Sequence, residues 1–183
     1  MMKRLLIPLI LFLLLVIEGV ALDILPVSLL KGDLVFVSHW VFVFLVLLAI
    51  FYDRGDTHFS VFYGLLFGLL TDIVYTGILG VYMFSYAFIA YMIHGMTKIW
   101  HANFFVTILL GTVGLIFVEI FINLIFSVTG VAELVWKDYL VDRLVPTVIA
   151  NVAFLLVLYP IFTKRLIRWK DEQLSDSTKF NRL

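Results

Sequence analysis

The chain has 183 residues, of which 63% are hydrophobic and 14% are charged. Soluble domains contain about 45–50% apolar and about 25% charged residues, so this composition excludes an ordinary water-soluble protein. The 13 basic and 13 acidic residues balance, which gives no sign of nucleic-acid binding, and the lack of cysteine excludes disulfides and thiolate chemistry. The sequence therefore predicts a membrane protein.

Six apolar segments follow one another along the chain, and each is long enough to cross a hydrocarbon core of about 30 Å as a helix. They lack the in-out alternation of barrel strands, which predicts an all-α integral membrane bundle. We expect one six-helix transmembrane domain over residues 1–183, with a short basic cytoplasmic tail at 168–183. The predicted spans are 5–22, 34–52, 58–75, 78–96, 104–128 and 141–167.

The first segment has two interpretations. Two basic residues precede an apolar run that ends in Gly19, Val20 and Ala21, which is the pattern of a signal peptide with a small-x-small cleavage site. Glu18 lies beside that site and argues mildly against cleavage, which favours a retained span.

The third segment carries Gly64, Gly68 and Asp72 on one helical face, at positions i, i+4 and i+8. Small residues at this spacing let another helix approach closely. The pattern predicts a face for helix packing or for a partner, and Thr76 and Gly77 predict a tight turn after it.

Three carboxylates, Glu18, Asp72 and Glu119, fall inside predicted spans, where an ionisable group costs at least about 2.5–3.5 kcal/mol. The helical rise places them in the outer half of the membrane, at nearly the depth of Arg143. We expect a polar cluster in which Arg143 is the counter-ion of one or more of them. The alternative is that each carboxylate reaches the outer interface separately. The expected cluster comprises Glu18, Asp72, Glu119, Asn123, Arg143 and Asn151.

The last segment contains two prolines. Pro146 falls in the first turn, where its missing N–H costs little, whereas Pro160 should kink or end the helix near the inner surface. Basic side chains and a tryptophan follow, as a membrane-surface anchor requires, although a cytoplasmic docking site is an alternative. The anchor residues are Lys164, Arg165, Arg168, Trp169 and Lys170.

The basic residues also predict the orientation. With a cytoplasmic N-terminus, 10 of the 13 Lys and Arg residues fall inside and 3 fall outside. The positive-inside rule then places both termini in the cytoplasm.

The sequence contains no recognisable catalytic or metal-binding constellation. The histidines, His39, His58, His94 and His101, fall near predicted span ends and lack a carboxylate at metal-ligand spacing, so we interpret them as ordinary interfacial residues. A nucleophile elbow and a phosphate-binding glycine loop are also missing. We therefore expect no enzymatic activity, metal or cofactor. The carboxylates could still form a proton relay, which keeps a transporter as an alternative.

Residues 64–83, GLLFGLLTDIVYTGILGVYM, resemble the most recognisable segment of the rod shape-determining protein MreD family. In that family a Gly-x-x-x-Gly-Leu-x-x-Asp helix precedes a short turn and Leu-Gly, and Gly80 occupies the last position here. The late Glu18, residues 142–147 and Asn151 resemble Bacillus-type members, so the resemblance extends over the whole chain. The family-like positions are Gly64, Gly68, Asp72, Gly80, Arg143, Pro146 and Asn151.

The resemblance implies a protein of the bacterial cell membrane without known enzymatic activity. It would partner the membrane-spanning protein MreC, and indirectly MreB and the RodA/class B penicillin-binding protein synthase, to direct lateral peptidoglycan synthesis. The family's six-helix arrangement is similar to the substrate-binding component of ECF vitamin transporters, although fold does not establish transport. We expect a non-enzymatic scaffold of the rod complex. The alternative is a small-molecule binding or transport component that uses the outer polar cluster.

Overall fold

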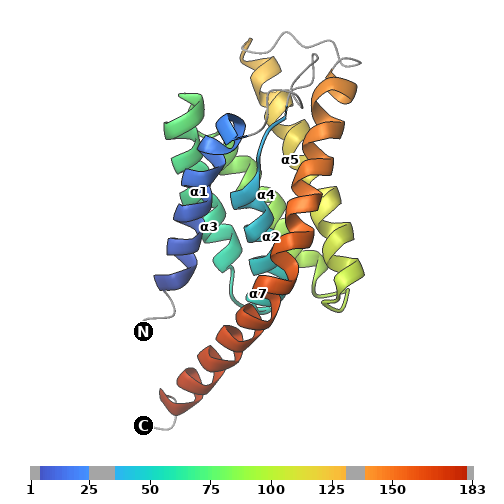
Figure 1. The fold of residues 1–183 in the computed structure, drawn as a ribbon. Helices are drawn as coiled ribbons and strands as arrows, with labels where there is room; N and C mark the ends of the chain where they lie inside the picture. The colour runs from blue at the N-terminus through green and yellow to red at the C-terminus, as the bar shows by residue number, and fades with distance from the viewer. Residues whose placement is uncertain (1–4, 25–35, 131–138, 181–183) are drawn as a thin grey trace.

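The computed structural model describes residues 5–24, 36–130 and 139–180, and within these ranges the regular secondary structure is entirely helical. The described ranges contain six α-helices, and two π-helical segments adjoin α3 and α7 (Figure 1). The elements are α1 Leu6–Ile24, α2 Trp40–Phe51, α3 Phe59–Thr71, η2 Asp72–Thr76, α4 Val81–Met96, α5 Phe104–Val128, η3 Tyr139–Leu144 and α7 Val145–Phe180.

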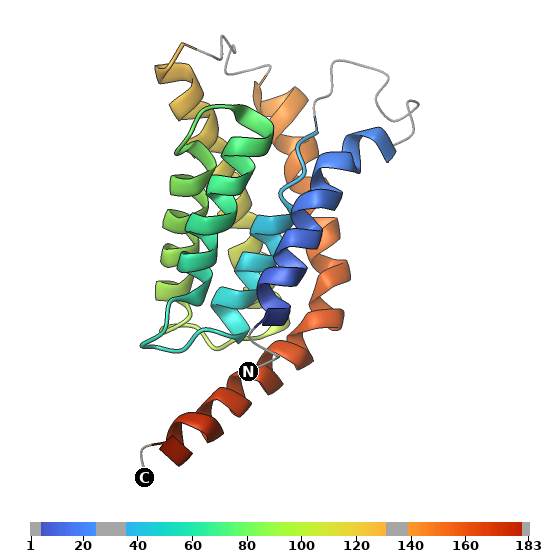
Figure 2. The same cartoon turned by 90° about the vertical axis from the view of Figure 1, so that its left-hand side faces the viewer.

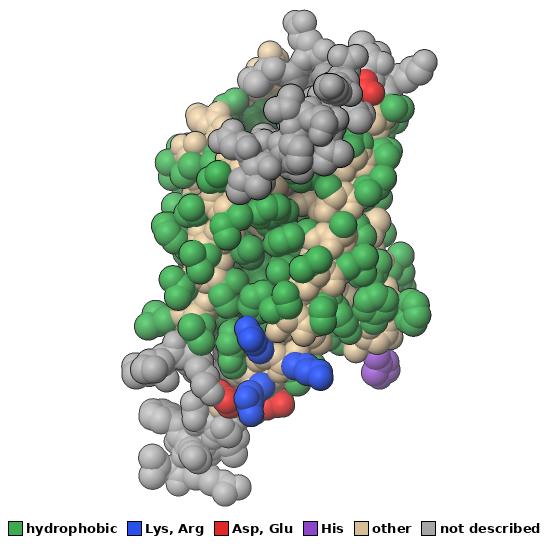
Figure 3. Space-filling model, in the orientation of Figure 1, with side chains coloured by type: hydrophobic (Ala, Val, Ile, Leu, Met, Phe, Trp, Pro, Cys, Tyr) green, Lys and Arg blue, Asp and Glu red, His purple; other side chains and the backbone are tan. Residues whose placement is uncertain are grey.

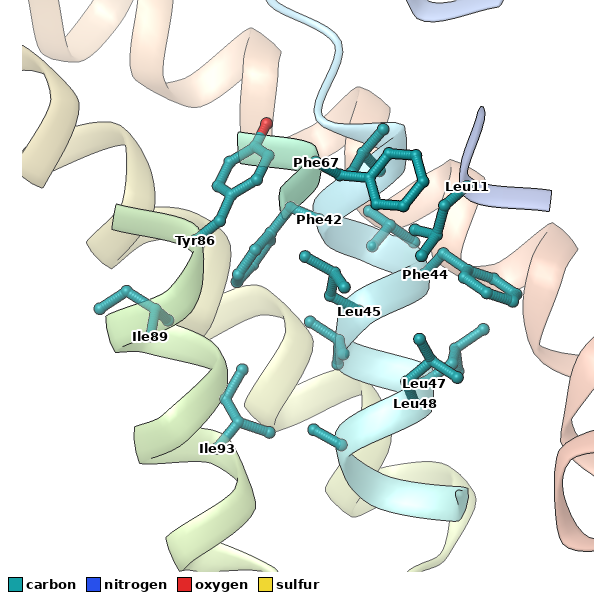
Figure 4. Close-up of a cluster of buried hydrophobic side chains, with 14 of the residues drawn as sticks. Leu11, Phe42, Phe44, Leu45, Leu47, Leu48, Phe67, Tyr86, Ile89 and Ile93 are labelled. Atoms are coloured by element: carbon teal, nitrogen blue, oxygen red, sulfur yellow. The ribbon is translucent and has the colours of Figure 1, made fainter. Parts of the chain in front are cut away.

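Helix α2 forms the centre of the bundle. Each residue from Val41 to Tyr52 is buried, as expected for a helix that is hydrophobic on all sides. Helices α1, α3, α4, α5 and α7 all pack against it. Figure 4 shows Phe42 and Leu45 of α2 among Leu11 of α1, Phe67 of α3 and other core side chains. The core of the protein is therefore built around one short, enclosed helix.

Among the described residues, three helices are long and apolar enough to cross a membrane, namely Phe59–Thr76, Phe104–Val128 and Tyr139–Glu172. Shorter apolar helices occupy Leu6–Val20, Trp40–Phe51 and Val81–Met96. Apolar side chains cover the flank of the bundle, and the described Lys and Arg side chains on this face gather at its lower end (Figure 3). This distribution is that of an integral membrane protein with a helical bundle.

The second predicted span was wrong in one respect. We expected a helix over 34–52, but residues 36–39 are not helical and the helix begins only at Trp40. Residues 34 and 35 lie outside the described residues. In Figure 2 this non-helical segment runs beside the upper half of α1. The sequence did not reveal the break because its hydrophobicity continues through it.

The last helix is longer than predicted. It continues through Pro160 as far as Phe180, a total of 36 residues. Such a helix is about 54 Å long, which exceeds a hydrocarbon core of about 30 Å. Figure 1 shows its C-terminal half leaving the bundle at an angle. Of the two outcomes expected at Pro160, an end of the helix does not occur, since the helix continues for 20 residues beyond it.

Helices α3 and α4 pack very closely, because α3 presents glycines to the backbone of α4. A Cβ atom at Gly68 would lie 2.6 Å from Met83 Cα, and one at Gly64 would lie 3.0 Å from Ala87 Cα. The connection between the two helices uses the left-handed conformation at Gly77 and Gly80, where φ is 69° and 102°. The glycine face is thus occupied by this chain's own α4.

We predict that Gly68→Ala lowers the free energy of unfolding by about 1–3 kcal/mol, because the methyl group would overlap the α4 backbone. Gly64→Ala should cost less, since its nearest contact is longer. Gly95→Ala is the control, because a Cβ there meets nothing within 4 Å. Thermal unfolding in detergent measures all three variants, and equal stability of the Gly68 and Gly95 variants would contradict the packing.

Candidate functional site

The polar side chains of the bundle fall into separate groups. Asp72 is fully buried and accepts hydrogen bonds from the N–H groups of Gly80 at 2.8 Å, Tyr82 at 2.9 Å and Met83 at 3.1 Å. These groups open α4, and a carboxylate at a helix N-terminus is stabilised by the helix dipole. Asp72 therefore caps α4 and does not pair with Arg143.

Glu18 has the same role at the start of α2. Its carboxylate accepts the Val41 N–H at 3.0 Å, and the Trp40 N–H also bonds to it. Its backbone carbonyl accepts the Ser38 hydroxyl at 3.1 Å. Glu18 is 6% exposed and holds α1 against the non-helical segment. The single cluster expected from the sequence is thus divided, with Glu18 and Asp72 at two different helix ends.

Glu119 is the carboxylate that pairs with Arg143. One of its oxygens lies 2.6 Å from His39 Nε2, and the other accepts the Tyr139 hydroxyl at 3.1 Å and Arg143 Nε at 3.3 Å. The second ring nitrogen of His39 lies 2.9 Å from the Tyr86 hydroxyl. The Glu119 and His39 side chains are fully buried, whereas that of Arg143 is 22% exposed. We call the five residues His39, Tyr86, Glu119, Tyr139 and Arg143 the Glu119 network.

The interpretation of His39 as an interfacial residue was therefore wrong. It lies in the protein core because residues 36–39 turn inward before α2 begins. One signal in the sequence pointed toward it, since an intramembrane carboxylate requires a partner. Sequence alone could not choose His39 because the partner comes from a span 80 residues away.

Asn151 and Thr147 of α7 satisfy the backbone of the non-helical segment. Asn151 Oδ1 accepts the His39 N–H at 2.7 Å, and its amide group donates to the Val37 carbonyl at 2.8 Å. Thr147 Oγ1 accepts the Val37 N–H at 3.1 Å. Unpaired backbone groups are too costly to face lipid, so non-helical backbone at this depth needs such partners.

Asn123 and the predicted membrane-surface anchor lie apart from the Glu119 network. Asn123 is buried on α5, one turn beyond Glu119. The anchor residues lie in the C-terminal half of α7, where Trp169 packs on the core and the Lys170 carbonyl accepts a hydrogen bond from the Arg54 guanidinium at 3.3 Å. Lys164, Arg165 and Arg168 are exposed there.

A third helix cap lies between α2 and α3, at Asp53, which the sequence analysis did not single out. The Asp53 carboxylate accepts the N–H groups of Phe59 at 2.9 Å and Ser60 at 3.0 Å. Burial raises the pKa of the Asp53 carboxyl, although the hydrogen bonds from Ser60 and Phe59 act in the opposite direction. His94 Nδ1 lies 3.9 Å from this carboxylate. Within the described ranges the structure contains no group of side chains suited to hold a metal ion.

A cavity of about 270 Å³ lies beside Glu18, between α1, the non-helical segment and the α3–α4 hairpin. Its walls combine the carboxylate of Glu18 and the hydroxyl-bearing Ser38 with one phenylalanine and two tyrosines. The lining residues are Glu18, Gly19, Phe36, Val37, Ser38, Tyr75 and Tyr82.

The fold and the polar groups together define a polytopic helical membrane protein whose buried polar side chains tie its helices together. A sequence profile described as rod shape-determining protein MreD matches residues 3–168. The Rod shape-determining protein MreD of Bacillus subtilis (strain 168) is 31% identical over 163 residues, which cover 86% of this chain and 90% of that protein. The chain belongs to the MreD family, and its role lies in determining rod shape. No solved structure matches it, so the likeness to ECF components stays a prediction.

We predict that Thr147→Val destabilises the protein by about 1–3 kcal/mol, because the Val37 N–H would lose its partner inside the bundle. Asn151→Leu should cost more, since two backbone groups lose theirs. Thr163→Val is the matched control, because the Thr163 hydroxyl bonds only within its own helix, to the Tyr159 carbonyl. Melting temperatures in detergent measure the effect. A Thr147 variant as stable as the Thr163 variant would contradict this account.

We also predict that Glu119→Gln lowers the melting temperature more than Arg143→Gln does, because Glu119 is bound by three side chains and Arg143 is partly exposed. Exchange of the two charges in one protein should not restore stability, since an arginine at 119 would face His39 and Tyr139. A complete double-mutant cycle of melting temperatures tests this. Recovery in the exchanged protein would show that the Arg143 pair dominates the network.

Proposed function

We propose that this chain is a non-enzymatic scaffold of the cell-elongation complex, which partners MreC to direct lateral peptidoglycan synthesis. Membership of the MreD family carries the proposal. MreB and the RodA/class B penicillin-binding protein synthase would be reached indirectly, through that partner.

The structural roles of the buried polar side chains support the proposal of a scaffold. Asp53 and Asp72 cap helices, and the Glu119 network joins α2, α4, α5 and the start of α7. Each of these carboxylates is held by donors of its own chain, which is the arrangement of a structural group and not of a reactive one. Rigid elements of this kind suit a protein whose work is contact with other proteins.

The contact with MreC is proposed to lie away from the glycine face. Gly64 and Gly68 are covered by α4, so a partner helix has no access to them. The apolar side chains on the outside of the bundle offer the alternative surface, and they are also the ones that face lipid (Figure 3).

Both termini are proposed to be cytoplasmic. The first turn of α1 and the last turns of α7 lie at the same end of the bundle (Figure 2). That end also carries Arg54 and the anchor residues of α7, in agreement with the positive-inside rule. The anchor residues would then lie at the inner leaflet.

A second candidate is a small-molecule binding or transport component of the ECF type. The observation that favours it is the cavity beside Glu18, a concave space with a few convergent polar groups. The Glu119 network is not part of the cavity wall. A site of this kind would therefore centre on Glu18, and not on the joint polar cluster that the sequence predicted.

In Bacillus subtilis cells depleted of their own MreD, we expect this chain to restore rod shape and to retain MreC when it is purified through a tag. Cell length and width measured by microscopy report the first result, and immunoblotting of the purified complex reports the second. Gly68→Leu is the control that should leave round cells, because it disrupts the α3–α4 packing. Depleted cells that stay rods but require a nutrient would favour the second candidate.

A further inference from the structure

We propose that the cavity beside Glu18 binds an organic ammonium group. The proposal deepens the second candidate function by naming a ligand class, and it is independent of the scaffold role. It depends on three properties of the cavity: an incompletely compensated carboxylate, aromatic walls and a small volume.

The carboxylate of Glu18 lacks a full positive partner within the part of the chain that the structure describes. Its donors are the backbone N–H groups of Trp40 and Val41. A helix N-terminus supplies only about half an elementary charge. The ion pairs of the described residues involve Glu119 and Asp53, and no Lys, Arg or His side chain among them reaches Glu18. A buried carboxylate has about four lone-pair sites, so acceptor capacity is left for a cation in the cavity.

Aromatic rings form much of the remaining wall. Phe36, Tyr75 and Tyr82 line the cavity together with Glu18. Tyr75 is fixed in place, because its hydroxyl donates to the Leu15 carbonyl of α1 at 2.7 Å. The faces of aromatic rings attract cations, and cages of such rings recognise quaternary ammonium groups. A carboxylate with aromatic neighbours therefore favours an organic cation over a hydrated metal ion.

The volume restricts the size of the ligand. The cavity volume is about 270 Å³. It lies just below the range of about 300–1,000 Å³ that is typical of sites for drug-sized ligands. The cavity thus suits an ammonium head with a short chain. That chemistry has two sources in a membrane, namely a free amine and the headgroup of an aminophospholipid.

Choline tests the charge requirement when it is compared with 3,3-dimethyl-1-butanol, its neutral isostere. Saturation-transfer NMR on the purified full chain in detergent should show choline bound at least about tenfold more tightly than the alcohol. Glu18→Gln keeps an acceptor for the α2 N–H groups but removes the charge, so it should abolish this preference. Phe36→Leu should weaken choline binding without touching the carboxylate. Asp171→Asn, an exposed carboxylate at the far end of α7, is the matched control and should bind like the parent.

Nanodiscs distinguish the two sources. If the ligand is a lipid headgroup, choline binding should fall when phosphatidylethanolamine is added to phosphatidylglycerol nanodiscs. If it is a free amine, binding should be the same in both membranes and should be displaced by ethanolamine. Equal binding of choline and its neutral isostere would overturn the ammonium assignment while keeping a small-molecule site. Absence of choline binding, or full binding by both Glu18→Gln and Phe36→Leu in monodisperse protein, would overturn the site itself. None of these binding results changes the outcome expected in the rod-shape experiment, so the two proposals can fail separately.

Discussion

The structure depends on one constraint, which is that the backbone at the entry to α2 must form hydrogen bonds inside the bundle. Residues 36–39 leave the helical conformation, and each peptide group there needs a partner because lipid offers none. Asn151 and Thr147 of α7 bind the backbone of Val37 and His39, and the Glu18 carboxylate of α1 accepts the N–H of Val41 at the start of α2. The first, second and last helices are thus joined by the backbone of one short segment. Helix α2 can then be short and fully enclosed.

The same structural role is shared by three of the four carboxylates that are buried in the described part of the chain. Glu18 caps α2, Asp53 caps α3 and Asp72 caps α4, each by accepting the N–H groups at the start of the next helix. A helix N-terminus inside an apolar environment has unpaired donors and a partial positive charge, and a carboxylate satisfies both. Glu119 differs because its partners are side chains, among them His39 and Arg143. Caps fix individual helices, whereas the Glu119 network fixes how distant helices lie against one another.

These roles of the buried carboxylates bear on the function of the protein. Polar groups that hold the helices together give a rigid bundle whose outside is apolar, as a membrane scaffold requires. Glu18 is the exception, because the same carboxylate that caps α2 also borders a cavity. A ligand there would contact α1, the non-helical segment and the α3–α4 hairpin at once. Its binding would therefore act on the junction on which the fold depends.

The sequence by itself determined the class of protein, the order of the apolar helices in the described part of the chain and the family. Hydrophobicity and residue spacing are local properties, so they revealed the apolar segments, the face of Gly64, Gly68 and Asp72, and the carboxylates that need partners. The tertiary structure alone decided which partner each carboxylate has. It placed His39 and not Asp72 beside Glu119, and it began the second helix only at Trp40, because these outcomes depend on which distant segments adjoin. A sequence records the need for a partner, and only packing selects it.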